Sequence, residues 1–168
     1  MRLMRMLLLG ALLATAADPV WKPFDYFVGS WRGTSQGKSG TARCERTFRF
    51  VLNDRFLEVR NKATYAPQEK NPRGDVHEDW GLISFDRMNK KFVFRQFHVE
   101  GYVNQYVLES SEDKKLVFTS ESVENLPADW RARETYRIVN ENHFVETFEL
   151  AAPGKDFEVY SEARFKRR

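Results

Sequence analysis

The chain has 168 residues, of which 42% are hydrophobic and 14% aromatic, and this length suits one domain with a single core. Its formal net charge of +3 falls to +1 once Arg2 and Arg5 are set aside with the leader described below. Acidic and basic residues also alternate within the same segments, which is typical of solvated strand faces. These features exclude a one-sided basic surface, so we expect no nucleic-acid partner.

The first 17 residues have the order of a secretory signal peptide. Arg2 and Arg5 precede an apolar run over residues 6–14, and the small-residue sequence ATA follows. The run is far shorter than the ~20 residues that span a bilayer, so we expect no stable membrane anchor. We predict a signal peptide over residues 1–17 and an exported domain, periplasmic or secreted, over residues 18–168. A short buried N-terminal helix is the alternative.

The remainder of the chain alternates in polarity and is rich in Val, Phe, Tyr and Thr, which is typical of antiparallel strands. Helical periodicity is almost absent, apart from a short lid helix expected over residues 24–28. The pattern predicts ten strands, over residues 30–36, 41–51, 55–65, 76–85, 91–99, 102–110, 115–123, 130–139, 143–150 and 156–166.

Strands with one apolar face and no helices to cover it must close on themselves or form a sandwich. We predict an all-β fold, an antiparallel up-and-down β-barrel. Because each strand reverses direction, the short connections gather at one end and the longer, proline-containing connections over residues 66–75 and 123–129 at the other. This predicts a tight floor and a loop-rich mouth, near which binding groups should lie, with Trp130 beside an entering ligand.

The stretch "DYFVGSWRGTSQG" over residues 25–37 begins the first strand at the floor. The last strand ends at the same floor, which brings Arg164 towards Trp31. We predict that Trp31 plugs the barrel floor and that Arg164 stacks over its ring. Gly29 and Gly33 would let the chain bend around the indole. The alternative is that Trp31 is one core aromatic residue among many.

Four motifs, "GSWRGTSQG", "LNDRFLEV", "WGLISFDRMNKKFVF" and "YSEARFKRR", give the chain a family resemblance. Together they resemble the calycin pattern of lipocalins, fatty-acid-binding proteins and nitrobindins, and most of all an exported bacterial lipocalin-like family without an assigned function. The resemblance covers most of residues 24–166 and implies a ligand-holding barrel of around ten strands. Nitrobindin-like barrels also bind haem through a late-strand histidine. Here only His143 is available, beside a tight turn, so we expect no cofactor and keep haem as an alternative.

Side chains alternate across a strand, so the more apolar face of each segment should point into the barrel. The expected inward set is Phe48, Phe50, Leu57, Val59, Tyr65, Phe92, Phe94, Tyr102, Tyr106, Leu108, Leu116, Phe118, Tyr136, Ile138, Phe144, Phe148, Phe157 and Val159. Polar residues share these faces and need partners, because burying them unpaired costs about 1–3 kcal/mol each. They are Arg46, Asn61, Gln96, His98, Asn104, Glu134 and Glu146.

These polar residues favour a binding function. We predict a barrel that binds a small hydrophobic or amphipathic molecule in an interior cavity, with its tail among the phenylalanines and its polar end at the mouth. Arg46 would balance one of the inward carboxylates. The predicted ligand-binding residues are Gln96, His98, Asn104, Tyr106, Glu134, Tyr136, Glu146 and Arg46. The alternative is that His98 is a structural histidine with its hydrogen bonds satisfied, and that Glu134 and Glu146 are solvated or structurally paired carboxylates.

Other functions have weaker support. An enzyme acting on a small hydrophobic substrate would use His98 with Glu134 or Glu146 as acid and base, but no nucleophile motif is present, and we assign no catalytic residue. His77 and Asp79 share a strand face, yet two ligands do not make a metal site, and we expect none. A barrel with a filled core that binds a partner would show an apolar patch on its outer wall. The sequence leaves the ligand and the oligomeric state open.

Overall fold

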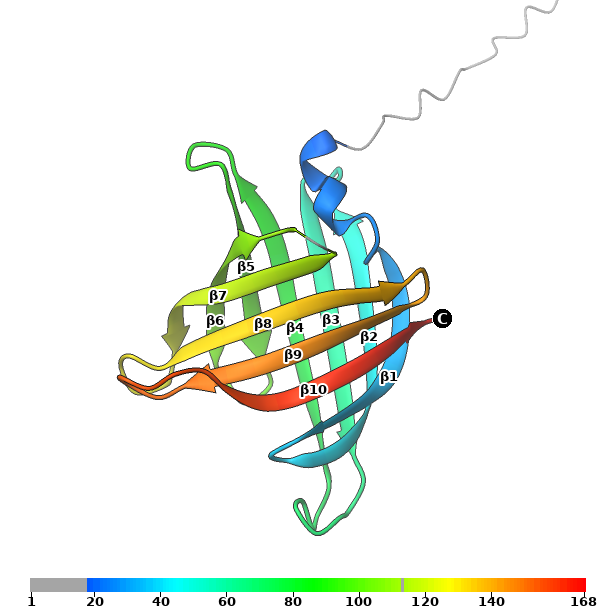
Figure 1. Ribbon diagram of the computed structural model, residues 1–168, viewed down its shortest axis with the longest axis vertical. Coiled ribbons are helices and arrows are strands. Elements are labelled where there is room, and N and C mark those ends of the chain that lie inside the picture. The colour runs from blue at the N-terminus through cyan, green and yellow to red at the C-terminus, as the bar shows by residue number, and fades with distance from the viewer. Residues whose placement is uncertain (1–17, 113) are drawn as a thin grey trace, which may run out of the picture.

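The computed structural model describes residues 18–112 and 114–168, which form the predicted all-β barrel (Figure 1). All ten strands lie within two residues of their predicted bounds. They follow a short 3-10 helix, η1 (Pro19–Phe24), and are β1 (Gly29–Gly37), β2 (Gly40–Val51), β3 (Phe56–Tyr65), β4 (Asp75–Asp86), β5 (Lys91–His98), β6 (Val103–Ser110), β7 (Lys115–Glu124), β8 (Arg131–Asn140), β9 (His143–Ala151) and β10 (Glu158–Arg167).

The strands form one closed antiparallel sheet. Each strand pairs with the next in sequence, and β1 pairs with β10 to close the barrel. Closure gives each of the ten described strands a neighbouring strand on both sides, as the run of amphipathic strands requires. The predicted signal peptide lies outside the described residues. Within the described part of the chain, no helix is long and apolar enough to cross a membrane.

Residue alternation explains why these segments are strands. Along β2 the positions from Gly40 to Phe48 are alternately buried and exposed, with Ala42, Cys44 and Arg46 among the buried ones. A period of two places one face on the interior and the other in water. Most of the expected inward apolar residues are accordingly buried or packed against the core.

Three of the expected inward residues do not line the interior. Val159 is 56% exposed because the β9–β10 register shifts between Val159 and Ser161, which turns the earlier residue outward. Tyr102 lies in the β5–β6 connection and is exposed. Phe157 precedes β10, and its ring centroid lies 4.3 Å from the guanidinium carbon of Arg133. Arg133 is on the outer face of the barrel.

One end of the barrel is covered by η1, on the side of the β4–β5 turn, while the long β3–β4 connection lies at the opposite end (Figure 1). Trp21, Phe24 and Phe27 of this N-terminal segment are buried in the barrel end. The lid helix therefore lies earlier than the predicted residues 24–28. Asp18 fixes its start, since its carboxylate accepts a hydrogen bond from the Val20 amide at 3.1 Å.

Trp31 is buried in this closed end. Its indole Nε1 donates a hydrogen bond of 2.7 Å to the Phe27 carbonyl, and its ring packs edge-on against Phe144 at 4.8 Å. The prediction that Arg164 stacks over the ring is wrong. Arg164 lies opposite Thr34 in the β1–β10 register, points outward and forms an ion pair with Glu162.

Arg167 provides the stacking cation instead. It pairs with Trp31 across β1 and β10, and its guanidinium carbon lies 4.1 Å from the indole centroid. Its guanidinium also donates hydrogen bonds to the carbonyls of Tyr26 and Val28. Because inward positions alternate, Phe165 and Arg167 face the interior while Arg164 does not.

The two glycines flanking Trp31 serve different needs. Gly29 has φ +123°, a conformation that side chains disfavour. A Cβ on Gly33 would lie 1.9 Å from the Arg164 carbonyl oxygen. Gly33 therefore permits the close approach of β10 to β1, and its role is in strand pairing rather than in bending around the indole.

Candidate functional site

A network of polar side chains occupies the barrel interior between the aromatic closed end and the mouth, the end that carries the long connections. The predicted ligand-binding residues Arg46, Gln96, Asn104, Tyr106, Glu134, Tyr136 and Glu146 are all buried within it, and His98 is partly exposed. They come from β2, β5, β6, β8 and β9. Their inward direction follows from strand alternation, whereas ligand contact by these residues stays a prediction.

The middle of the network contains one buried cation and two buried carboxyl groups. Arg46 Nη1 lies 2.6 Å from Glu146 Oε2, and the Tyr136 hydroxyl donates a hydrogen bond to Glu134. Desolvation raises the pKa of Glu134 to about 8, and it also raises the pKa of Glu146, while the Arg46 charge opposes both shifts. Since Arg46 is in direct contact with Glu146, Glu134 is the carboxyl that keeps its proton near neutral pH.

The raised pKa of Glu134 leads us to expect that the folded protein loses stability as the pH rises. In the folded protein its pKa is about 8, against an ordinary 4.5, so between these values the folded state holds a proton that the unfolded state releases. The contribution of Glu134 to the free energy of unfolding is therefore fully present below about pH 4.5 and decreases until about pH 8. Urea unfolding of the wild type and of Glu134→Gln across this range should show a smaller decline in the variant, whose amide does not ionise.

Glu109→Gln is the matched control for this experiment, because Glu109 is exposed on β6. Its unfolding free energy should follow the wild-type pH profile. Parallel profiles for Glu134→Gln and the wild type would show that Glu134 is already ionised at neutral pH and would contradict the assignment.

Towards the mouth, Asp79 joins three strands through amide donors. Asn61 Nδ2 donates to Asp79 Oδ2 at 2.8 Å, and Gln96 Nε2 donates to Oδ1 at 2.9 Å. Hydrogen bonds with His77, Gln96 and Asn61, together with the Arg46 charge, outweigh burial and lower the pKa of Asp79 to about 2. Among the described residues, none donates to the buried Gln96 Oε1. This acceptor is available to a guest molecule or to water.

Two histidines complete the polar side at the mouth. Asn104 Nδ2 lies 3.0 Å from His98 Nε2 and 2.8 Å from the Tyr106 hydroxyl. His77 lies beside His98, with ring centroids 5.4 Å apart. Burial lowers the pKa of His98, whereas hydrogen bonding to Asp79, supported by Glu100, raises the pKa of His77 to about 9.

The opposite side of the mouth is apolar. Phe148 and Leu150 of β9 face the interior, since they pair with the inward Glu134 and Ala132 of β8. Phe148 packs edge-on against Tyr160 at 5.8 Å, and both remain partly exposed. Solvent therefore reaches inward-facing apolar side chains at this end. The mouth thus presents a polar side from β3–β6 and an apolar side from β9–β10.

The closed half differs from the predicted cavity. Phe48, Phe94, Phe118 and Phe144 are at most 2% exposed and pack against neighbouring rings at centroid distances of 4.8–6.5 Å. These contacts fill the space that a ligand tail was expected to occupy. Any interior ligand would therefore lie in the mouth half.

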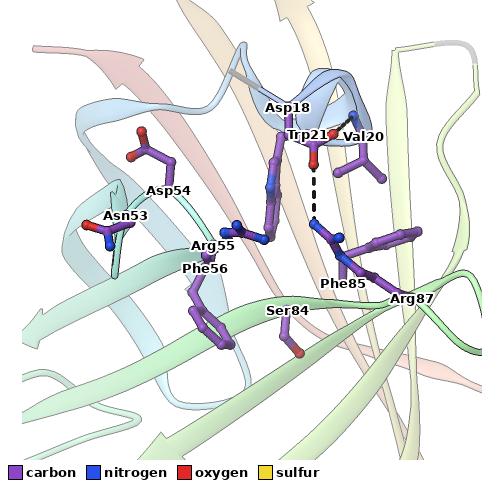
Figure 2. A pocket seen from close by; sticks show the side chains of 10 residues that line it. All are labelled: Asp18, Val20, Trp21, Asn53, Asp54, Arg55, Phe56, Ser84, Phe85 and Arg87. Atoms are coloured by element: carbon purple, nitrogen blue, oxygen red, sulfur yellow. Dashed lines mark hydrogen bonds and ion pairs between the residues drawn. The ribbon is translucent and has the colours of Figure 1, made fainter. Parts of the chain in front are cut away.

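Two surface hollows lie away from the polar network. The larger, of about 750 Å³, is beneath η1 at the closed end, where Asp18 and Arg87 form an ion pair of 3.7 Å across it (Figure 2). The second, of about 700 Å³, is on the outer wall over β1, β2 and β8–β10. Neither is lined by a residue of the network, and both are open to solvent, so we place the candidate site at the mouth.

The alternative chemistries fit this geometry poorly. Within the described residues, no hydrogen bond joins His98 to Glu134 or Glu146, as the acid–base hypothesis required, and His98 bonds Asn104 instead. His143 is exposed and bonds Asn140 Oδ1 at 2.9 Å, while its neighbour Phe144 faces inward. The strand β9 therefore places no histidine inside the barrel that could serve as an axial ligand for haem.

The sequence predicts the residues of the polar network but not that His77, Asp79 and His98 meet at the mouth. The sequence places His77 and Asp79 on one strand face, and two ligands alone do not predict a metal site. The β4–β5 register places His98 directly opposite Asp79, which supplies a third group. Counting residues back from the β4–β5 turn would have found this pair.

Comparisons with known proteins support the fold alone. No family model matches the chain, and no curated protein matches its sequence. The crystal structure of Rv2717c from M. tuberculosis has a TM-score of 0.69 at 17% identity, covering 91% of this chain and 99% of that one. A de novo designed fluorescence-activating β-barrel has a TM-score of 0.45 at 14% identity, covering 85% of this chain and 94% of that one. The chain is thus similar in architecture to a natural antiparallel β-barrel.

Proposed function

We propose that this protein is an exported, calycin-like binding protein that holds a small amphipathic molecule in the mouth half of its barrel. The observation that carries the proposal is the division of the mouth into a polar side, ending at the unpaired acceptor Gln96 Oε1, and a partly exposed apolar side at Phe148 and Leu150. Export and the calycin relationship rest on the leader and on the sequence motifs.

The polar side suits a head group that both donates and accepts hydrogen bonds. Asn104 and Gln96 offer amide groups, and the charges there are already paired, because His77 contacts both Asp79 and Glu100. A neutral head therefore avoids the desolvation cost that an unpaired charge would meet there. The apolar part of the molecule would lie across the barrel against Phe148 and Leu150. This orientation replaces the predicted one, in which the tail enters the aromatic floor.

The proposal is tested with three eight-carbon probes that differ in head charge: 1-octanol, octanoate and octylamine. Thermal unfolding of the full mature chain, with EDTA present, should show the largest rise in Tm with 1-octanol, because a ligand that binds only the folded state stabilises it. Gln96→Leu and Phe148→Ser should each weaken the response at least tenfold in probe concentration.

Trp80→Ala is the control, because Trp80 lies on the outer wall and is 41% exposed. It should respond to 1-octanol like the wild type. The absence of any Tm response to all three probes, together with the absence of a small-molecule adduct in native mass spectra of the protein from its host, would end the proposal.

A partner-binding function is the second candidate, favoured by one observation on the outer wall. Trp80 of β4 and Phe97 of β5 are exposed and stack at 5.9 Å. Exposed aromatic pairs of this kind are enriched at protein interfaces. A change in oligomeric state or partner capture that Trp80→Ala abolishes, without any effect of Phe148→Ser, would favour this candidate.

A further inference from the structure

Three potential metal ligands meet at the mouth of the barrel. One donor atom each from His77, Asp79 and His98 lies within 4.8 Å of the others. Asp79 pairs directly with His98 across β4 and β5, and His77 is two positions earlier on the same face of β4. The three side chains therefore project from two hydrogen-bonded strands, a rigid support for a binding site.

His77 is already oriented as a metal-binding histidine would be. Its Nδ1 lies 2.7 Å from Glu100 Oε1, and its Nε2 lies 3.5 Å from Asp79 Oδ2. Histidines that bind metals commonly donate their second ring nitrogen to a carboxylate, which fixes the tautomer and the ring orientation. Glu100 provides that support here and leaves Nε2 directed at the cluster.

The other two ligands are held by amide side chains. Asp79 accepts hydrogen bonds from Asn61 on one oxygen and from Gln96 on the other, and each carboxylate oxygen has a second lone pair. Asn104 Nδ2 lies 3.0 Å from His98 Nε2, which leaves Nδ1 as the ring nitrogen for an ion; binding there requires the Asn104 amide to turn its oxygen towards the Nε2 proton. These contacts fix the direction of two donors that would otherwise rotate freely.

We propose that His77, Asp79 and His98 bind one divalent transition-metal ion of the zinc class. Two imidazoles and one carboxylate suit Zn²⁺ and its neighbours in the first row, whereas Ca²⁺ and Mg²⁺ prefer oxygen ligands. Tetrahedral bonds of about 2.0–2.2 Å place ligand atoms roughly 3.4 Å apart. His77 Nε2 and Asp79 Oδ2 are already 3.5 Å apart, and the other separations, of up to 4.8 Å, would shorten by at most about 1.4 Å. The His77 side chain is 29% exposed, so an ion can reach the cluster from solvent.

Three protein ligands leave one coordination position open, as in sites that bind water or a small anion beside the metal. This inference goes beyond the amphiphile-binding proposal and does not rest on it. The amphiphile experiments are made with EDTA present, so failure of either proposal leaves the other in place.

Isothermal titration of the untagged, EDTA-treated mature chain with ZnCl₂ tests the site. We expect one equivalent to bind, and His77→Ala and His98→Ala each to weaken binding by at least about 10–100-fold, the range found even for partners that only support a ligand. Co²⁺ should give visible d–d absorption with the wild type, and this absorption should be lost in both variants.

His143→Ala is the matched control, because His143 is the third of the three histidines and is exposed beside the opposite end of the barrel. It should bind Zn²⁺ like the wild type. Circular dichroism checks that each variant is folded. If His98→Ala does not fold, the test of the site rests on His77→Ala, because His77 lies at the partly exposed rim and its loss should leave the barrel intact. Absence of stoichiometric binding, or an equal loss in His143→Ala and His77→Ala, would overturn the site.

Discussion

Trp31→Ala should destabilise the barrel by about 3–5 kcal/mol, the cost of truncating a fully buried aromatic side chain. Trp31 is 1% exposed, donates a hydrogen bond to Phe27, and lies between Phe144 and the Arg167 guanidinium. Its loss would leave a void at the end of the barrel and Arg167 without its aromatic partner. Urea unfolding followed by circular dichroism measures the change.

Trp80→Ala serves as the matched control for this substitution. Trp80 is 41% exposed on the outer wall, and its indole donates one hydrogen bond of 2.9 Å to Glu58. Glu58 is ionised, since its pKa is lowered to about 2, so removing this bond should cost about 1.5–3 kcal/mol, less than the loss of Trp31. Equal losses from the two substitutions would show that Trp31 has no special role in closing the barrel.

Glu146→Leu should cost about 3–5 kcal/mol, because it leaves Arg46 buried without its ion-pair partner. Arg46 is 4% exposed, so its charge is largely removed from water. The double variant Arg46→Met/Glu146→Leu should recover much of this loss. In that variant Glu134 keeps its proton, so no charge remains unbalanced in the barrel centre. A double-mutant cycle of unfolding free energies measures the coupling.

Additive losses in this cycle would contradict the assignment, since they would mean that Arg46 and Glu146 act independently. Arg43→Met/Glu45→Leu provides a control for substitution on β2, because Arg43 and Glu45 are exposed positions on the outer face of the same strand. Its effects should be small and additive.

The fold was predictable because strand alternation and connection length are local properties of the sequence. Ten amphipathic strands joined mostly by short turns bury their apolar faces when the sheet closes into a barrel. The alternation of β2 specified which of its residues face inward. One error arose where the period of two is interrupted, and the other arose where the alternation is unbroken but the register was misplaced. The shift between Val159 and Ser161 turned Val159 outward, and the exposed Arg164 was chosen where Arg167 is the residue opposite Trp31.

The candidate site was predictable in composition but not in arrangement. Polar residues on otherwise apolar faces identified Gln96, Asn104 and Glu134 as interior residues, since they shared a parity with buried neighbours. Their partners depend on the register between strands, and register is set by bulges and turns that composition does not specify. Composition therefore did not reveal that aromatic packing fills the closed half, and the pairing of His98 with Asp79 follows only once the bounds of the β4–β5 turn are known.

The central claim, that the mouth accepts a ligand and the aromatic end does not, is tested most directly by NMR. The four tryptophans report on different places: Trp21 and Trp31 on the closed end, Trp80 on the outer wall, and Trp130 just before β8 at the mouth. Titration of the ¹⁵N-labelled chain with 1-octanol should shift the Trp130 indole and the side-chain amides of Gln96 and Asn104, and leave the Trp21 and Trp31 indoles in place. Shifts confined to Trp21 and Trp31, or to Trp80, would contradict it.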